Sequence, residues 1–135
     1  MKVYIAGAIT GYNLEERRQA FLSGAAMAFN FLPEPNLMKV INPMDLEHDH
    51  DKSWRSYMQE CIVALTRCDA IFMMPCWSGS KGANLELKIA EGLGLKIYFA
   101  HDGGVVQRLK GDPICKKLEP KHSEPLKVPD RGLMQ

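Results

Sequence analysis

Residues 73–94 place a glutamate where an amphipathic helix normally carries an apolar side chain. Projected at about 100° per residue, three residues form the polar face of this helix: Asn84, Lys88 and Glu91. Glu86 falls on the apolar side, on one stripe with Ile89, Ala90 and Leu93. Because burying an unpaired carboxylate costs several kcal/mol, we expect a sequence that keeps Glu86 there to use it.

Two kinds of role suit a buried carboxylate at this position. Glu86 stands about one turn into the helix, beside a glycine- and serine-rich loop. It can act as a nucleophile toward a sugar carbon, as in retaining glycoside chemistry. The alternative is a structural glutamate that pairs with a backbone N–H or a nearby arginine. The residues alone leave both hypotheses open.

The loop before this helix, residues 76–82, has the composition of an anion-binding turn. It contains Ser78, Ser80 and two glycines, and it leads into a helix N-terminus whose free N–H groups and dipole suit a phosphate. The serine hydroxyls add further donors. The alternative is an ordinary strand-to-helix turn that uses a serine as the helix cap.

The elements that must position these residues alternate along the chain. Short β-prone runs occupy residues 3–6, 38–42, 70–74 and 96–100. Helices are predicted between them: one after an Asn13 cap with Glu16 three residues later, one starting near Ser53, and the one that bears Glu86. This alternation predicts an α/β fold, a parallel sheet of four to five strands with helices on both faces.

Helical periodicity predicts which side chains cover the sheet. The first helix places six residues on one stripe: Phe21, Gly24, Ala25, Ala28, Phe29 and Leu32. The second helix has a similar stripe: Trp54, Tyr57, Met58, Cys61, Ile62 and Leu65. We expect both stripes to be buried.

The fold class predicts where a ligand binds. In open parallel sheets the site lies beyond the carboxyl ends of the strands, where the strand order reverses. In the common five-strand order this point lies between the first and third strands, so residues 7–11 and 76–82 flank it. The candidate substrate-binding residues are therefore Gly7, Thr10, Gly11, Trp77, Ser78, Ser80 and Gly82. Trp77 either stacks on a bound base or covers the core as a rim aromatic.

Composition sets the broad class of protein. The chain has 135 residues, enough for one domain with a core, and 17 basic against 16 acidic residues. This balance argues against a nucleic-acid or anionic-membrane partner, and no apolar run approaches the roughly 20 residues of a membrane span. A signal peptide is also not expected, and the four cysteines form no CxxC pair, so free thiols in the cytoplasm are predicted.

The C-terminal part has little periodicity. We expect an α/β domain over residues 1–100 and a C-terminal extension, residues 101–135, that packs on it or trails from it. Prolines interrupt the extension repeatedly. It is predicted to form loops with either one short helix near residues 114–118 or an edge strand near residues 126–128.

Other polar residues are weaker candidates. Residues 48–51, His-Asp-His-Asp, are adjacent in a polar loop and are expected to be solvated rather than to bind a metal. Cys76 is either a reactive thiol near a helix N-terminus or a small apolar filler. His101 and Asp102 follow the fourth strand and face the expected crevice, whereas Asp69 at a strand start is predicted to be structural.

Five short motifs carry a resemblance to a known family: residues 4–7, 41–43, 53–57, 65–71 and 77–86. The last of these, Trp-x-x-Ser-x-Gly-Ala-x-x-Glu, is the most specific. Together the motifs resemble the DUF4406 family of small phage and bacterial domains over residues 1 to about 100. That family in turn resembles the nucleoside 2-deoxyribosyltransferase superfamily.

The resemblance implies a flavodoxin-like fold, usually a homodimer or higher homo-oligomer, that cleaves the N-glycosidic bond of a deoxynucleoside or its monophosphate without a cofactor. Glu86 matches the superfamily nucleophile, and Tyr4 matches a first-strand tyrosine that helps to position it. Ser80 matches a serine that binds the 5′-phosphate in the monophosphate hydrolase branch, where the transferase branch carries an aspartate. The resemblance therefore favours nucleotides as ligands.

One position departs from the superfamily pattern. Eight residues before the aspartate of the third strand, both branches carry a further aspartate that serves the site, and here that position is Cys61. A thiol is not a comparable acceptor or acid at neutral pH. Two hypotheses follow: an enzyme that cleaves or transfers at the N-glycosidic bond through Glu86, or a non-catalytic nucleotide-binding module.

Overall fold

The computed structural model describes residues 1–8, 13–32, 39–46, 53–75, 77–108 and 115–120. Six strands form one sheet: β1 (Lys2–Ala6), β2 (Lys39–Ile41), β3 (Ala70–Met73), β4 (Lys96–His101), β5 (Gly104–Arg108) and β6 (Cys115–Leu118). Their order is β2-β1-β3-β4-β5-β6, with parallel pairing from β2 to β4 and antiparallel pairing from β4 to β6. The predicted α/β class is confirmed, but the predicted count of four to five strands is wrong.

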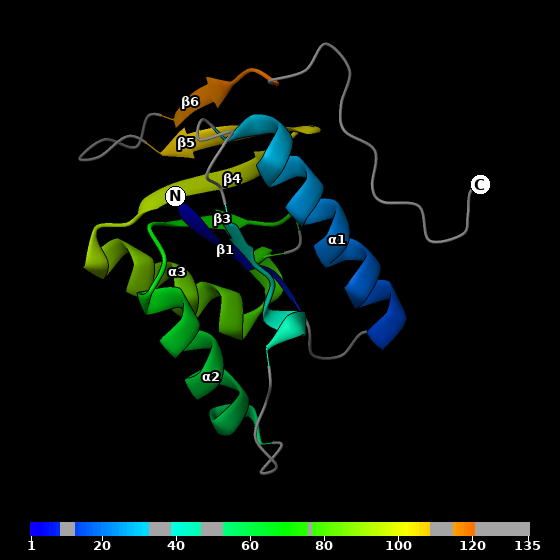
Figure 1. Ribbon diagram of the computed structural model, residues 1–135, viewed down its shortest axis with the longest axis vertical. Helices are drawn as coiled ribbons and strands as arrows, with labels where there is room; N and C mark the ends of the chain where they lie inside the picture. Colours follow the sequence, from blue (N-terminus) through cyan, green and yellow to red (C-terminus); the bar gives the residue numbers. More distant parts are fainter. Residues whose placement is uncertain (9–12, 33–38, 47–52, 76, 109–114, 121–135) are drawn as a thin grey trace.

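Three α-helices cover this sheet: α1 (Leu14–Phe31), α2 (Trp54–Thr66) and α3 (Lys81–Leu93). Two short 3₁₀ helices, η1 (Pro43–Asp45) and η2 (Trp77–Gly79), follow β2 and β3. Figure 1 shows α1 on one face of the sheet and α2 with α3 on the other. Helices on both faces confirm the layered arrangement predicted from the alternation of elements.

Alternation along β1 divides the core into two halves. Val3 and Ile5 belong to a cluster with Phe21 and Ala28 of α1. Tyr4 instead belongs to a second cluster, together with α2 and α3 side chains. Since successive side chains of a strand point to opposite faces, Tyr4 lies on the same side of the sheet as α3.

The ends of the helices follow their predicted caps. The Asn13 side chain accepts hydrogen bonds from the backbone N–H groups of Glu15 (2.9 Å) and Glu16 (3.1 Å) at the start of α1. Ser53 accepts from the N–H of Ser56 (3.0 Å) at the start of α2. Such caps satisfy donors that the first turn of a helix leaves free.

The predicted helix stripes are partly wrong. Phe29 is 40% exposed and Trp54 is 40% exposed, although both were expected in the core. On α3, Leu93 is 52% exposed, because the buried face runs through Ala83, Glu86, Leu87 and Ala90. The periodicity thus gave the correct side for Glu86 but extended the apolar stripe one turn too far.

The largest disagreement lies after β4. The prediction of a short helix near residues 114–118 is wrong, because residues 115–118 form β6. Asp102 (φ 47°) and Gly103 (φ 76°) make a two-residue turn between the paired residues His101 and Gly104, and Asp-Gly is a preferred pair for such hairpins. The alternative edge strand, near residues 126–128, lies outside the described residues.

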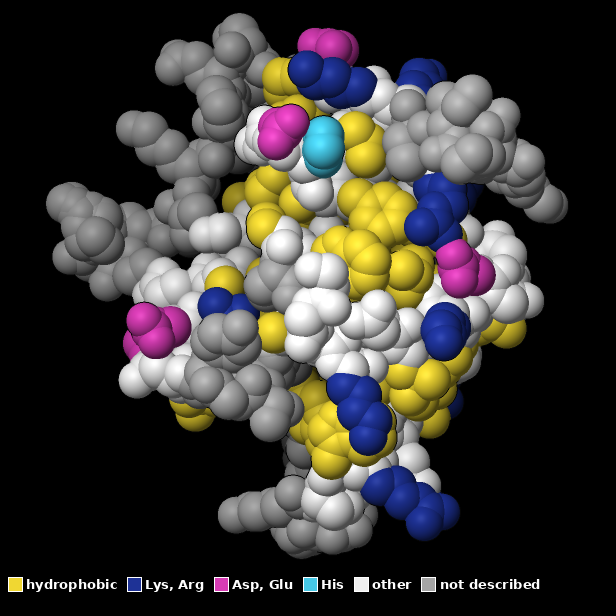
Figure 2. Space-filling view, turned by 180° about the vertical axis from the view of Figure 1, so that it is seen from behind, with side chains coloured by type: hydrophobic (Ala, Val, Ile, Leu, Met, Phe, Trp, Pro, Cys, Tyr) yellow, Lys and Arg dark blue, Asp and Glu magenta, His cyan; other side chains and the backbone are white. Residues whose placement is uncertain are grey.

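The surface is mixed in character. On the face shown in Figure 2, Lys and Arg side chains occur in several small groups with acidic side chains among them, and apolar side chains fill the centre. Within the described ranges, none of the helices combines the length and apolar character needed to span a bilayer.

Candidate functional site

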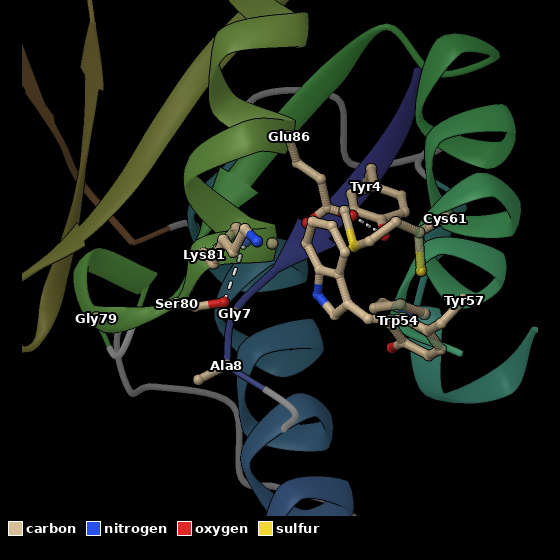
Figure 3. A pocket seen from close by; sticks show the side chains of 14 residues that line it. Tyr4, Gly7, Ala8, Trp54, Tyr57, Cys61, Gly79, Ser80, Lys81 and Glu86 are labelled. Atoms are coloured by element: carbon tan, nitrogen blue, oxygen red, sulfur yellow. Dashed lines mark hydrogen bonds between the residues drawn. The ribbon is translucent and has the colours of Figure 1, made fainter. Parts of the chain in front are cut away.

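A pocket of about 620 Å³ opens at the carboxyl end of β1, between α2 and α3. Its walls come from β1 and the residues after it, from η1, from α2, and from the start of α3. The side chains that line it are shown in Figure 3. This is the side of the sheet on which Tyr4 and Glu86 lie, and β1 and β3, between which the strand order reverses, are adjacent here.

Glu86 and Tyr4 meet in this pocket. The Tyr4 hydroxyl donates a hydrogen bond of 2.5 Å to Oε2 of Glu86. Glu86 is 4% exposed and Tyr4 is fully buried. Neither of the two ion pairs found in the described part of the chain involves Glu86. The carboxylate is therefore held by a tyrosine from β1 rather than by an arginine.

Burial changes the ionisation of Glu86. Loss of solvation raises the pKa of this carboxyl from 4.5 to about 7, while the hydrogen bond from Tyr4 opposes the rise. A buried carboxylate loses more hydration than one hydrogen bond returns. Near neutral pH, Glu86 therefore exchanges between its charged and neutral forms.

Cys61 lies beside this pair on α2. It is 1% exposed and lines the pocket. Burial raises the pKa of the Cys61 thiol to about 11, although hydrogen bonds with Tyr4 and Tyr57 act in the opposite direction. Burial also raises the pKa of the Tyr57 hydroxyl. At neutral pH both groups keep their protons, so Cys61 adds no second charge next to Glu86.

The start of α3 forms the opposite wall. Ser80 is the helix cap, and its Oγ accepts a hydrogen bond of 3.1 Å from the N–H of Ala83. The serine oxygen is used as an acceptor, which leaves its O–H able to donate to a ligand. The serine that caps the helix is therefore Ser80, and Ser80 lines the same pocket as Glu86.

Asn84 fixes the shape of the preceding turn, which the sequence did not reveal. Its side-chain NH₂ group donates to the carbonyl oxygens of Ser80 (2.7 Å) and Ser78 (3.1 Å), and more weakly to that of Trp77 (3.4 Å). Helical periodicity alone places Asn84 on the polar face of the helix and predicts no further role for it. The four-residue spacing between Ser80 and Asn84 places them on the same side of one helical turn.

Two further pocket residues were not predicted as site residues. The Lys81 ammonium lies 4.4 Å from the centre of the Trp54 ring, a cation–π contact across the pocket between α3 and α2. Among the described residues that line this pocket, Lys81 is the one with a basic side chain. The Trp54 exposure noted above has this explanation: the ring faces the pocket rather than the core (Figure 3).

Glycines allow the walls to approach each other. A Cβ atom at Gly82 would lie 3.0 Å from Sδ of Met58, so a larger residue would require the flexible Met58 side chain to shift. Gly7 is buried and lines the pocket just after β1. The next carbonyl, that of Ala8, accepts a hydrogen bond of 3.0 Å from Nη1 of Arg17. The glycine at position 82 therefore lets the Met58 side chain pack directly against the start of α3.

The structure brings together only part of the predicted site. Tyr4, Gly7, Ser80, Gly82 and Glu86 line the pocket. Trp77 and Ser78 are not among the described residues that line it: the Trp77 ring packs on Phe99 with centroids 5.6 Å apart, and Ser78 is exposed. Thr10, Gly11 and Cys76 lie outside the described residues, as does the His-Asp-His-Asp segment.

The remaining candidates have other roles. Oδ2 of Asp69 accepts a hydrogen bond of 2.8 Å from the backbone N–H of Lys2, so its predicted structural role is confirmed. His101 and Asp102 are exposed, with Nε2 and Oδ2 3.3 Å apart, and neither is among the described residues that line this pocket. Cys61 and Cys68 are free thiols. Over the described ranges, no cluster of three potential metal ligands occurs.

The pocket has two chemically different ends. Glu86, whose pKa is about 7, lies at one end of the pocket. The N-terminus of α3, with Ser80 and Lys81, lies at the other end. Because a helix rises 1.5 Å per residue, the five residues from Lys81 to Glu86 separate these ends by about 7.5 Å along the axis. Such a pocket suits a ligand with an anionic group at one end and an electrophilic centre at the other.

Comparison with known proteins gives one family. A family model described as "Domain of unknown function (DUF4406)" matches residues 1–99, which include every described wall of the pocket. The search of curated proteins found no match, and neither did the search of solved structures.

Proposed function

We propose, from the premise that this chain belongs to the DUF4406 family, that it cleaves or transfers at the N-glycosidic bond of a deoxynucleoside 5′-monophosphate with Glu86 as the nucleophile. The family description assigns no function, so the proposal depends on the pocket. The resemblance of the family to the nucleoside 2-deoxyribosyltransferase superfamily favours the same reaction.

One observation carries the proposal: a buried carboxylate, held by the Tyr4 hydroxyl, lines a pocket. Glu86 is 4% exposed, accepts the 2.5 Å hydrogen bond from Tyr4 and has its pKa raised to about 7 by burial. A glutamate kept for structure alone is expected to have its charge neutralised by an arginine or by several backbone donors. Perturbed carboxyls that face a pocket are typical of catalytic sites.

The reaction can be written so that its atoms balance. An oxygen of ionised Glu86 attacks C1′ of the sugar, and the electrons of the C1′–N bond pass to the base, which gains a proton as it leaves. Water, or a second base, then attacks C1′, and the Glu86–C1′ bond breaks. With water, one proton is released and the products are the free base and 2-deoxyribose 5-phosphate.

Protonation of the leaving base is the weakest step of this scheme. Tyr4, Tyr57 and Cys61 are the titratable neighbours of Glu86, and burial raises the pKa of all three. Groups that hold their protons so tightly are inefficient acids at neutral pH. The proposal therefore favours bases that leave readily or take a proton from solvent.

The opposite end of the pocket supports a phosphate. Ser80 has a free donor, Lys81 carries a positive charge, and α3 presents its N-terminus. In a nucleoside 5′-monophosphate, five bonds of about 1.5 Å separate phosphorus from C1′, a span of roughly 5–6 Å. This span is of the same order as the rise of about 7.5 Å along the helix axis between the backbone positions of Lys81 and Glu86.

A specific observation favours the second candidate function, a nucleotide-binding module without turnover. Cys61 is a neutral thiol, with its pKa raised to about 11, where the resembled superfamily carries an aspartate. Among the described residues that line the pocket, Glu86 then has no second carboxylate beside it to accept hydrogen bonds from the sugar hydroxyls. Binding would survive this change better than catalysis.

For the remaining biology we infer a small-molecule nucleotide or nucleoside as the ligand, with no cofactor, no nucleic-acid partner and no membrane partner. The near balance of 17 basic and 16 acidic residues supports this inference. By resemblance to the superfamily, the chain forms a homodimer or a higher homo-oligomer and works in the cytoplasm.

The test is incubation of the protein with a panel of deoxynucleoside 5′-monophosphates, with free base measured by chromatography. At least one substrate should release its base, and Glu86→Gln should abolish the release because the amide cannot attack C1′. Glu91→Gln is the matched control, since it removes an exposed carboxylate from the same helix. Release that persists in Glu86→Gln would contradict the proposal, and binding without release would favour the binding module.

A further inference from the structure

A second pocket, of about 300 Å³, lies on the other face of the sheet, between α1 and the β4–β5 turn. One stripe of α1 forms its long wall, with the spacing i, i+3, i+4, i+7, i+8: Ser23, Ala26, Met27, Asn30 and Phe31. Pro75 after β3 and residues 100–103 complete it. None of the described residues that line it also lines the pocket of Glu86.

Asn30 is the unusual member of this wall. It is 1% exposed, and within the described part of the chain neither its Oδ1 nor its Nδ2 has a hydrogen-bond partner. A side-chain amide can donate two hydrogen bonds and accept two. Buried polar groups are almost always paired, and an unpaired one lowers stability. Nothing in the packing of α1 explains why an asparagine stands here instead of leucine.

The rest of the pocket defines what would satisfy this amide. Ala26, Met27, Phe31, Pro75 and Ala100 are apolar. The ionisable side chains, those of His101 and Asp102, are 65% and 88% exposed, so they lie toward solvent. A charged ligand would lose its hydration against these apolar walls without a compensating ion pair. The complement of the pocket is a neutral molecule.

The geometry of an amide limits the chemistry further. Because its oxygen and NH₂ group are side by side, an asparagine forms two parallel hydrogen bonds with a molecule that presents an N–H next to an acceptor, as it does with the edge of adenine. The volume agrees with one ring system. At about 30 Å³ for each water molecule, 300 Å³ holds about ten, and since bonded ring atoms lie closer together than water molecules, a nucleobase of roughly eight to eleven non-hydrogen atoms fits inside.

We propose that this second pocket is a binding site for a neutral heterocycle of nucleobase size, recognised through paired hydrogen bonds to the Asn30 side chain. Both amide atoms are shielded from solvent, so a wall side chain must move to admit the ligand. Met27 precedes Asn30 by three residues on the same stripe, and an unbranched thioether adapts its shape easily. The site is independent of the chemistry at Glu86.

Methionine methyl groups report on the two pockets separately. Met27 lines the second pocket and Met58 lines the first. The full chain is labelled with ¹³C-methyl methionine, its Met27 and Met58 signals are assigned from Met27→Leu and Met58→Leu, and 9-methyladenine is titrated. This base should shift the Met27 signal in a saturable way and leave Met58 in place. 9-Methylpurine, the same ring system without any N–H donor, should bind at least tenfold more weakly.

The variant Asn30→Leu tests the role of the amide. It keeps the size of the side chain and removes both unpaired atoms, so it should abolish the shift of Met27 and raise the melting temperature of the free protein. The wild-type titration with 9-methyladenine and 9-methylpurine needs no variant and decides the matter if Asn30→Leu does not fold. No shift of Met27 at millimolar 9-methyladenine, a shift of Met58 alone, or equal affinity for 9-methylpurine would each overturn the proposal.

Discussion

Replacing Glu86 with glutamine should change how the stability of the protein depends on pH. In the folded state the pKa of Glu86 is about 7, raised from 4.5 by burial. Between these two pH values the folded protein holds a proton that the unfolded chain has released, so stability falls as the pH rises through this window. Above pH 7 the buried charge is present, and its cost is fully expressed.

The size of the effect follows from the same pKa. A rise from 4.5 to about 7 corresponds to about 3 kcal/mol at 1.36 kcal/mol per pKa unit, of which about 2.5 kcal/mol develops between pH 5 and pH 8. Glutamine has the same shape and never ionises. The difference in the free energy of unfolding between Glu86→Gln and wild type should therefore move by about 2.5 kcal/mol in favour of the variant from pH 5 to pH 8.

Urea unfolding at pH 5, 6, 7 and 8 measures this difference, with fluorescence of the two tryptophans as the signal. Glu60→Gln, which removes an exposed carboxylate from α2, is the control for the loss of one negative charge. Comparing the variant with wild type at each pH cancels the titration of all other groups. A difference that stays constant within about 0.5 kcal/mol across this range would refute the description of Glu86 as a carboxyl perturbed by burial.

Four further predictions concern the pocket. The rate of base release should rise with pH through about 7, as Glu86 ionises, and a pH–rate profile that falls through neutrality would oppose a nucleophilic carboxylate. Tyr4→Phe removes the hydrogen bond that lowers the pKa of Glu86, so the midpoint of the pH–rate profile should move to higher pH and the rate at pH 7 should fall. An unchanged midpoint would mean that this hydrogen bond does not lower the pKa of Glu86. Calorimetry should show that wild type binds a deoxynucleoside monophosphate more tightly than the nucleoside, by roughly 1.5–3 kcal/mol for one charge-assisted hydrogen bond. Ser80→Asp should reverse this order of affinities. Equal affinities of wild type for the two ligands would mean that Ser80 does not bind the phosphate. Cys61→Asp should lower both activity and stability, because a second carboxylate beside Glu86 raises its pKa further, and a variant that cleaves much faster than wild type would instead indicate a binding module descended from an enzyme.

The sequence predicted those parts of the fold that depend on local periodicity. The order of strands and helices up to residue 100, the Asn13 cap and the inward position of Glu86 are all present. The two antiparallel strands after β4 were missed. Both strands are short, and a proline follows each of them. The Asp102-Gly103 turn was therefore the one local sign of a hairpin, and the strands themselves depend on pairing within the sheet.

The site was less predictable than the fold, because it depends on contacts between elements. Tyr4 was identified through a family resemblance, and its hydrogen bond with Glu86 spans 82 positions of sequence. Lys81 and Trp54 come from different helices, and no pattern within either helix indicates that they meet. Trp77 was predicted at the site from its position in the loop, but contact with Phe99 of β4 turns it elsewhere.

A covalent bond between Glu86 and the sugar is the most direct sign of a nucleophilic glutamate. The protein is mixed with a cleavable deoxynucleoside 5′-monophosphate, quenched in acid within the first turnover, and examined by intact-mass and peptide mass spectrometry. We expect the added mass of one 2-deoxyribosyl 5-phosphate group on the peptide that contains Glu86, and none in Glu86→Gln. Base release by wild type with the added mass on another residue, or unchanged release by Glu86→Gln, would contradict this role of Glu86.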